Sequence, residues 1–251
     1  MESVREIATE PVESPVTAAD TGGRALIEQN IADWDERYSR RPRWSRYPPE
    51  ELAGFIAKTF PDREQRRFLK ALEVGCGPGA NLWFLAREGF RIAGIDGSAV
   101  AITSARERLR AEGMTEQLLQ ADLEVGNFAL LPWNDSSFDA VIDIQAISHN
   151  TAPVIQSVIA EIRRVLKPGG WFFARMFGEK TTGIMTGDLV EEKTTRCAEF
   201  GPLAGCGLVH AFSAEEIATL LSPFQTLTLD WVHRRVGKSS DVFEWIIQAK
   251  K

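Results

Sequence analysis

Residues 71–97, ALEVGCGPGANLWFLAREGFRIAGIDG, have the pattern of a strand, a glycine-rich turn, a helix and a second strand. Glycines at a strand-to-helix turn can adopt positive φ and let the backbone approach a ligand closely. The helix behind such a turn offers free N–H groups and the positive end of its dipole. The stretch therefore predicts a ligand site at the carboxyl ends of a parallel sheet.

Asp96 closes the second apolar run and follows Gly77 by roughly 20 residues. This spacing places a carboxylate at the tip of the neighbouring strand, where it can hold both hydroxyls of a ribose. Gly97 and Ser98 come next, and Ser98 is suited to cap a helix expected over residues 99–112. The pattern predicts a cofactor that contains a nucleoside.

The spacing alone leaves other interpretations open, namely a nicotinamide or flavin fold, which Gly75-x-Gly77-x-x-Ala80 also fits, or an ordinary turn without a ligand. Glu73 on the strand and Pro78 in the turn favour a third interpretation. With them the stretch resembles motif I of class I S-adenosylmethionine (SAM)-dependent methyltransferases, written ExGxGxG. The resemblance implies that the cofactor contacts Glu73, Gly75, Cys76, Gly77, Gly79, Asp96, Gly97 and Ser98, with the Cys76 side chain a small packing residue.

Two further stretches extend the resemblance over about residues 70–250. LPWNDSSFD at 131–139 is similar to the family's entry to strand four, and LKPGG at 166–170 to its turn before strand five. Residues 226–236 and 241–250 form two β-like runs that predict a hairpin. The expected fold is α/β: a Rossmann-like, doubly wound, seven-stranded, mostly parallel sheet. Its C-terminal antiparallel hairpin inserts the last strand between strands five and six.

The adenine site is expected beside the third strand. Residues 116–120 are interpreted as this strand, so that Asp122 just after it can accept from the adenine amino group. The resemblance implies that Leu123 supplies a backbone N–H. A simple turn aspartate is the alternative for Asp122. Gln145, at the carboxyl end of strand four, is expected in the cofactor crevice.

The N-terminal part is divided into a flexible leader, residues 1–22, and a helical lid, residues 23–68, before the methyltransferase domain at 69–251. Trp34 and Tyr38 match the WxxxY-type segment that covers the methionine end of SAM in many small-molecule methyltransferases. Arg43 and Trp44 lie in an arginine–aromatic stretch, residues 37–46. This stretch is either a solvated segment or a lid that binds an anionic or aromatic substrate.

Methyl transfer from a sulfonium needs alignment and desolvation, and an oxygen nucleophile can also need a general base. His149 follows the tip of strand four and is the candidate base and a candidate substrate contact, the alternative being a packing or loop-capping role. His210 lies in a variable segment, residues 176–210, that is expected to form the substrate wall. The spacing provides no metal site.

Composition limits the partners. The 251 residues carry a net charge of −6, which makes nucleic acid an unfavoured partner. No apolar run approaches a membrane span, and three unpaired cysteines suggest a reduced, cytoplasmic protein. The leading hypothesis is N- or O-methylation of a small metabolite with release of S-adenosylhomocysteine. The alternatives are an RNA or protein methyltransferase that docks through residues 37–46, and a SAM-fold protein that has lost transfer. The oligomeric state is not predicted.

Overall fold

The computed structural model describes residues 21–40 and 47–251. Arg43, Trp44 and nearly all of the predicted leader lie outside the described residues, so those expectations stay predictions.

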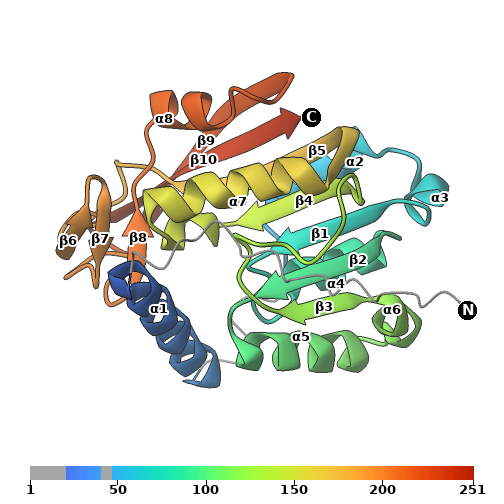
Figure 1. The fold of residues 1–251 in the computed structure, drawn as a ribbon, viewed down its shortest axis with the longest axis horizontal. Helices are drawn as coiled ribbons and strands as arrows, with labels where there is room; N and C mark the ends of the chain where they lie inside the picture. Colours follow the sequence, from blue (N-terminus) through green and yellow to red (C-terminus); the bar gives the residue numbers. More distant parts are fainter. Residues whose placement is uncertain (1–20, 41–46) are drawn as a thin grey trace, which may run out of the picture.

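Seven strands form one sheet in the order β3-β2-β1-β4-β5-β10-β9 (Figure 1). The first five strands in the chain are mutually parallel, while β10 runs antiparallel to both β5 and β9. The last strand therefore lies between β5 and β9, which confirms the fold expected from the sequence. The strands are β1 Lys70–Val74, β2 Arg91–Asp96, β3 Asp122–Val125, β4 Phe138–Ile144, β5 Leu166–Phe177, β9 Thr226–Val236 and β10 Ser240–Lys250.

Two helical layers cover the sheet. On one face, α7 (Ala152–Val165) and α8 (Ala214–Leu220) pack against the first core cluster. On the other, α2 (Glu50–Thr59), α4 (Ala80–Arg87) and α5 (Ala99–Ala111) pack against the second. Side chains of α7 bury at three- and four-residue steps, as an amphipathic helix requires. The short α3 (Arg63–Arg66) precedes β1.

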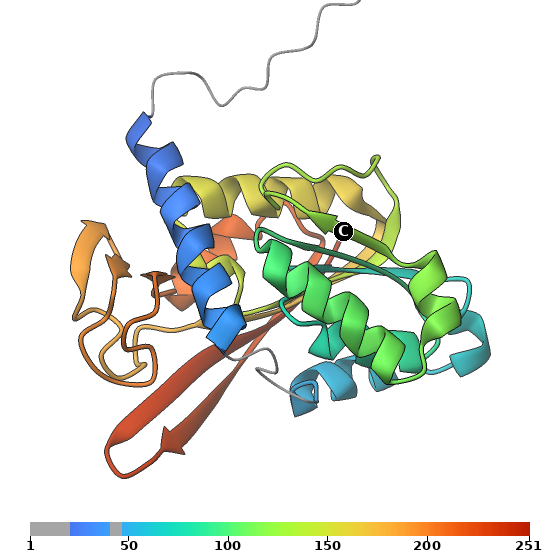
Figure 2. The same cartoon turned by 90° about the horizontal axis from the view of Figure 1, so that it is seen from below.

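The edge where the parallel strands end is covered by α1 (Thr21–Arg40), which crosses it in both views (Figures 1 and 2). The expected substrate wall differs from an irregular loop, because it contains a small sheet of β6 (Asp188–Glu191), β7 (Thr194–Arg196) and β8 (Leu208–His210). Of the predicted lid, α1 and the residues just before α2 reach this edge, whereas α2 itself joins a helical layer.

The position expected for the third strand is wrong. Residues Thr115–Gln120 form helix α6, and β3 begins only at Asp122. The segment TEQLLQ is rich in good helix formers and buries none of its residues, so it lacks the apolar content of a central strand. Asp122 pairs with Ala93 and Val125 pairs with Asp96, which puts Asp122 at the start of β3, away from the carboxyl edge.

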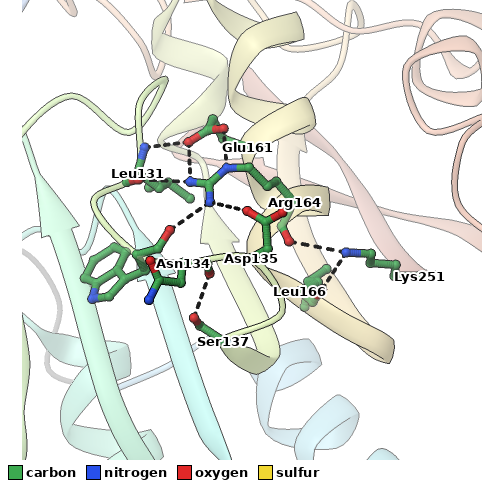
Figure 3. A network of polar contacts seen from close by, with 9 residues as sticks. Leu131, Asn134, Asp135, Ser137, Glu161, Arg164, Leu166 and Lys251 are labelled. Carbon is green, nitrogen blue, oxygen red and sulfur yellow. Dashed lines mark hydrogen bonds and ion pairs between the residues drawn. The ribbon is translucent and has the colours of Figure 1, made fainter. Parts of the chain in front are cut away.

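Arg164 of α7 forms hydrogen bonds and ion pairs with the loop that leads into β4, residues 131–135 (Figure 3). Its guanidinium donates to the carbonyls of Leu131 and Trp133 at 3.0 and 2.8 Å and pairs with Asp135 and Glu161. Lys251 donates to the carbonyls of Arg164 and Leu166, where α7 ends. These contacts hold residues 131–135 against α7 and fix the direction in which the chain enters β4.

Candidate active site

A cavity of about 810 Å³ opens at the carboxyl edge of the sheet, beneath α1. It is lined by the glycine loop after β1, by the ends of β2, β4 and β5, and by residues 202–204 beside the small sheet. This is the crevice in which doubly wound sheets bind their ligands. The cavity therefore lies where the sequence predicts a cofactor.

The glycine loop is shaped as the sequence predicts. Gly75, Gly77 and Gly79 have φ of +61°, +50° and +77°, values that disfavour any residue with a Cβ. A Cβ on Gly75 would lie 2.0 Å from that of Ala146, and one on Gly77 would lie 3.2 Å from the Tyr38 hydroxyl. The loop passes so close to its neighbours that glycine is required, and the Tyr38 hydroxyl lies directly against Gly77. Cys76 is buried and lines the cavity.

Glu73 and Asn81 place unpartnered polar atoms in the cavity wall. The Asn81 amide donates to Glu73 Oε1 at 2.6 Å, while Glu73 Oε2 and Asn81 Oδ1 have no hydrogen-bond partner in the described part of the chain. Burial raises the pKa of Glu73 to about 8, so the carboxyl is protonated at neutral pH. Buried polar atoms are rarely left unpaired, and a ligand in the cavity would pair these.

Asp96 lies at the tip of β2 and is held by backbone N–H groups. Its Oδ2 accepts from Gly77 at 2.8 Å and its Oδ1 from Ser98 at 2.9 Å. Burial raises the pKa of Asp96 to about 6 despite these hydrogen bonds. The Ser98 hydroxyl donates to Asp35 of α1, and Gly97 lies against Ile31 of the same helix. Glycine loop, β2 tip and α1 thus meet in one place, as expected for a ribose site.

The structure does not bring Asp122 and Leu123 to this cavity. Asp122 accepts from Trp133 Nε1 and from Lys70 Nζ, and the Leu123 carbonyl accepts from Arg106. The residues after β3 line the cavity instead, namely Gly126, Asn127 and Phe128. The missed signal is the Gly-Asn break that follows the apolar start of β3, a few residues before Leu131-Pro132.

Trp34, Tyr38 and His149 come together under α1. The Trp34 ring lies 4.8 Å from the His149 ring and 5.5 Å from the Tyr38 ring, measured between centroids. His149 Nδ1 lies 2.7 Å from the Leu208 carbonyl, and since a carbonyl only accepts, Nδ1 carries the proton and Nε2 the lone pair. Burial lowers the pKa of His149 to about 4, so the ring is neutral at pH 7.

His210 is not a wall residue of the cavity. Its Nδ1 bonds the Thr194 hydroxyl and its Nε2 bonds Glu216 Oε1, both at 2.7 Å. The ring is 2% exposed and links β8 to β7 and α8. His210, expected to contact substrate, is therefore placed outside the cavity lining, because β8 directs this side chain into the protein.

Gln145 lines the cavity as expected, and the lining residues that were not singled out from the sequence include Asn30, Arg175 and Phe177. A signal for Arg175 existed, since it is the one charged residue in the apolar run WFFARMF of β5. The described residues contain no cluster of three or more His, Cys, Asp and Glu suited to a metal ion. They also include no helix with the length and apolar character needed to cross a membrane.

Comparison with known proteins agrees with this geometry. The model of a family described as a methyltransferase domain matches residues 71–170. A sterol 24-C-methyltransferase of Gibberella zeae is 34% identical over 129 residues, which cover 51% of this chain and 32% of that protein. A 24-methylenesterol C-methyltransferase of Oryza sativa subsp. japonica is 36% identical over 104 residues, covering 41% of this chain and 27% of its own length. The chain thus spans about a third of the length of these relatives.

A solved structure shares the fold over nearly the whole chain. The 1,6-didemethyltoxoflavin-N1-methyltransferase of Burkholderia thailandensis, with bound 1,6-didemethyltoxoflavin and S-adenosylhomocysteine, superposes with a TM-score of 0.64. It is 15% identical, and the match covers 96% of this chain and 93% of that one. The sheet order is that of the class I SAM-dependent methyltransferase fold, and residues 71–170 match the methyltransferase-domain family.

Proposed function

We propose that the protein transfers a methyl group from SAM to an N or O atom of a small molecule. The observation that carries the proposal is the convergence of Glu73, the glycine loop and Asp96 on one cavity of about 810 Å³. That volume lies in the range of small-molecule and cofactor sites. The family match supports the choice of cofactor.

The residues present fit this cofactor. The glycine loop and the unpartnered atoms of Glu73 and Asn81 would hold the methionine part. Asp96 would accept from the ribose hydroxyls. Asn127 and the N–H of Phe128 would take the adenine, in place of Asp122 and Leu123. Bound SAM supplies an electrophilic methyl group on a sulfonium.

The chain's own residues align the acceptor and exclude water. Trp34 and Tyr38 of α1 cover the cavity, which favours desolvation of the reacting atoms. The lone pair on His149 Nε2 would accept the proton of an O–H or N–H nucleophile. Because Nδ1 is fixed on the Leu208 carbonyl, the ring presents this tautomer without rearrangement.

A small acceptor is favoured over RNA or protein. Of the arginine-rich stretch 37–46, Arg37 and Arg40 are described. The Arg37 guanidinium donates to the Gly205 carbonyl at 3.1 Å and lines the cavity, whereas Arg40 is exposed and pairs with Glu36 of its own helix. Arg37 therefore borders the ligand space. A steep loss of substrate binding with added salt would instead support the macromolecular alternative.

The test uses SAM labelled on the methyl group, incubated with the protein and an extract of the source cells. Label is expected in a small-molecule fraction and is expected to disappear with Asp96→Ala. Asp122→Asn is the matched control, since this aspartate lies outside the cavity, and it should transfer label normally. Label in RNA or protein would overturn the choice of acceptor. Absence of S-adenosylhomocysteine binding would overturn the function itself.

A further inference from the structure

Arg175 places a buried guanidinium in the cavity floor. It stands near the end of β5, in register with Ile144 of β4 and Ile246 of β10. Its side chain is 9% exposed and lines the cavity. Neither the glycine loop nor the ribose site contacts this arginine through any hydrogen bond in the described chain. Arg175 is thus a cavity residue that the proposed cofactor contacts do not use.

Two carboxylates hold the ends of this guanidinium. Nη1 donates to Glu51 of α2 at 3.1 Å, and Nη2 donates to Glu244 of β10, which is fully buried. Nε is buried and has no partner in the part of the chain that the structure describes. Leaving a buried donor unpaired is costly, so an acceptor atom of a ligand is expected at this N–H.

The side chain of Gln145 offers a hydrogen-bond acceptor and is held by the same carboxylate as Arg175. Its Nε2 donates to Glu244, the carboxylate that also binds Arg175, and its backbone N–H donates to the Arg175 carbonyl at 2.9 Å. Because Gln145 Nε2 already donates to Glu244, the amide oxygen Oε1 is the atom left for a ligand, and it has no hydrogen bond among the described residues. Gln145 also has φ +71°, a left-handed conformation that is strained for a residue other than glycine. Strain of this kind concentrates at binding and catalytic sites.

The local charge favours a neutral ligand group. Arg175, Glu51 and Glu244 together carry one negative charge, and Arg234 Nη2, at 3.5 Å from Glu244, balances it. A carboxylate that entered here would add an unpaired negative charge. A carbonyl oxygen would pair with the Arg175 Nε–H without that penalty.

We propose that Arg175 and Gln145 form a subsite for a neutral planar group with an adjacent carbonyl and N–H, as in a lactam or carboxamide. The carbonyl oxygen accepts from Arg175 Nε–H, and the N–H donates to Gln145 Oε1. The proposal rests on the proposed function, because it places this group on the methyl acceptor. It narrows the anionic or aromatic substrate expected from the sequence to a neutral one.

The test measures binding of three probes to the protein saturated with S-adenosylhomocysteine, by calorimetry. The probes are 2-pyridone, which has the cis carbonyl and N–H; N-methyl-2-pyridone, which lacks the N–H; and benzoate, which is anionic. We expect 2-pyridone to bind most tightly and N-methyl-2-pyridone to bind about fivefold more weakly than 2-pyridone. Benzoate should bind most weakly of the three. Arg175→Lys keeps the charge but removes Nε, and should weaken 2-pyridone about tenfold.

Arg66→Lys is the matched control, because Arg66 is equally buried but pairs with Glu88 outside the cavity. It should leave 2-pyridone affinity unchanged. Tighter binding of benzoate, equal binding of 2-pyridone to Arg175→Lys, or no pyridone binding to the complex would each overturn the subsite. Failure of S-adenosylhomocysteine to bind the wild-type protein would contradict the proposed function but not the subsite. In that case the affinities of the three probes would be measured on the protein without S-adenosylhomocysteine.

Discussion

At the residue scale, the proposed ribose contact of Asp96 predicts that cofactor binding depends on pH. Burial raises its pKa from 3.8 to about 6, so the ionised form that can accept from both ribose hydroxyls is lost as pH falls through about 6. The same shift has the opposite effect on the unliganded protein. Between about pH 4 and pH 6 the unfolded chain loses this proton first, so stability falls as pH rises through that window.

We therefore predict that S-adenosylhomocysteine affinity falls as pH drops below about 6, approaching tenfold per pH unit, because protonation removes an acceptor. Calorimetric titrations between about pH 5 and pH 8 measure this slope. Asp96→Asn should bind more weakly at high pH and lack the slope. A slope that persists in Asp96→Asn would assign it to another group.

His149 gives a second prediction at this scale. His149→Ala should lower methyl transfer by about 10²- to 10⁴-fold at pH 7 while S-adenosylhomocysteine affinity changes little, because a base acts on the acceptor and not on the cofactor. The pH profile of wild type should show no histidine inflection near 6.5, since the pKa of His149 lies at about 4. His233→Ala, an exposed histidine on β9, is the control. Full activity of His149→Ala would show that the His149 ring packs in the site and does not act as a general base.

At the scale of elements, α1 covers the cavity and is held there by side-chain contacts with the small sheet and with the turn after β4. Asn30 makes the connection, since its Nδ2 donates to the His149 carbonyl at 2.8 Å and its Oδ1 accepts from the Leu208 N–H at 3.2 Å. Arg196 of β7 also pairs with Asp33 of α1 at 3.1 Å. The cover thus depends on the small sheet and on the turn after β4, both of which border the cavity.

Asn30→Ala should loosen α1 without unfolding the domain. Loss of two hydrogen bonds corresponds to about 1–3 kcal/mol of local stability, which would speed amide exchange in α1 by roughly 10- to 100-fold. The KM for SAM should rise, while the melting temperature changes little. Gln29→Ala is the matched control, because within the described residues its side chain bonds Asp33 of the same helix and nothing else. Unchanged exchange in α1 would show that other contacts hold the cover.

At the scale of the whole molecule, charge and packing are distributed unevenly. The chain carries a net charge of −6, yet Arg37, Arg108, Arg175 and Arg234 line the cavity. An acidic protein disfavours nucleic acid at its surface. Within the cavity, the charges of Arg175 and Arg234 are balanced by Glu51 and Glu244. Contacts far from the cavity, such as those that Arg164 makes, are expected to contribute to global stability.

We predict that Arg164→Met lowers the free energy of unfolding by about 2–4 kcal/mol, because the Leu131 and Trp133 carbonyls and two carboxylates lose their donor. Urea denaturation measures the change. Arg163→Met should cost less than about 1 kcal/mol, since Arg163 is on the same helix and makes one exposed bond to the Pro223 carbonyl. Equal losses in the two variants would contradict the role of the network.

Prediction from sequence succeeded where local chemistry decides the structure. The glycine loop, the helix over residues 152–165 and the hairpin of β9 and β10 each follow from turn residues or apolar periodicity within one segment. It failed at residues 115–125, where a short apolar pair, Leu118-Leu119, was interpreted as a strand although α6 buries neither residue. That error moved the expected adenine contact to Asp122.

The sequence by itself determined the α/β fold, the cofactor loop and Asp96 at the tip of β2, because these depend on backbone conformations that nearby residues impose. Only the tertiary structure decided which distant side chains share the cavity. The exclusion of Asp122 from the cavity and the Arg175–Glu244–Gln145 cluster depend on register across the seven-stranded sheet, and the position of His210 depends on the small sheet. A turn can determine register within the hairpin of β9 and β10, whereas strands far apart in the sequence are aligned only when the elements pack together.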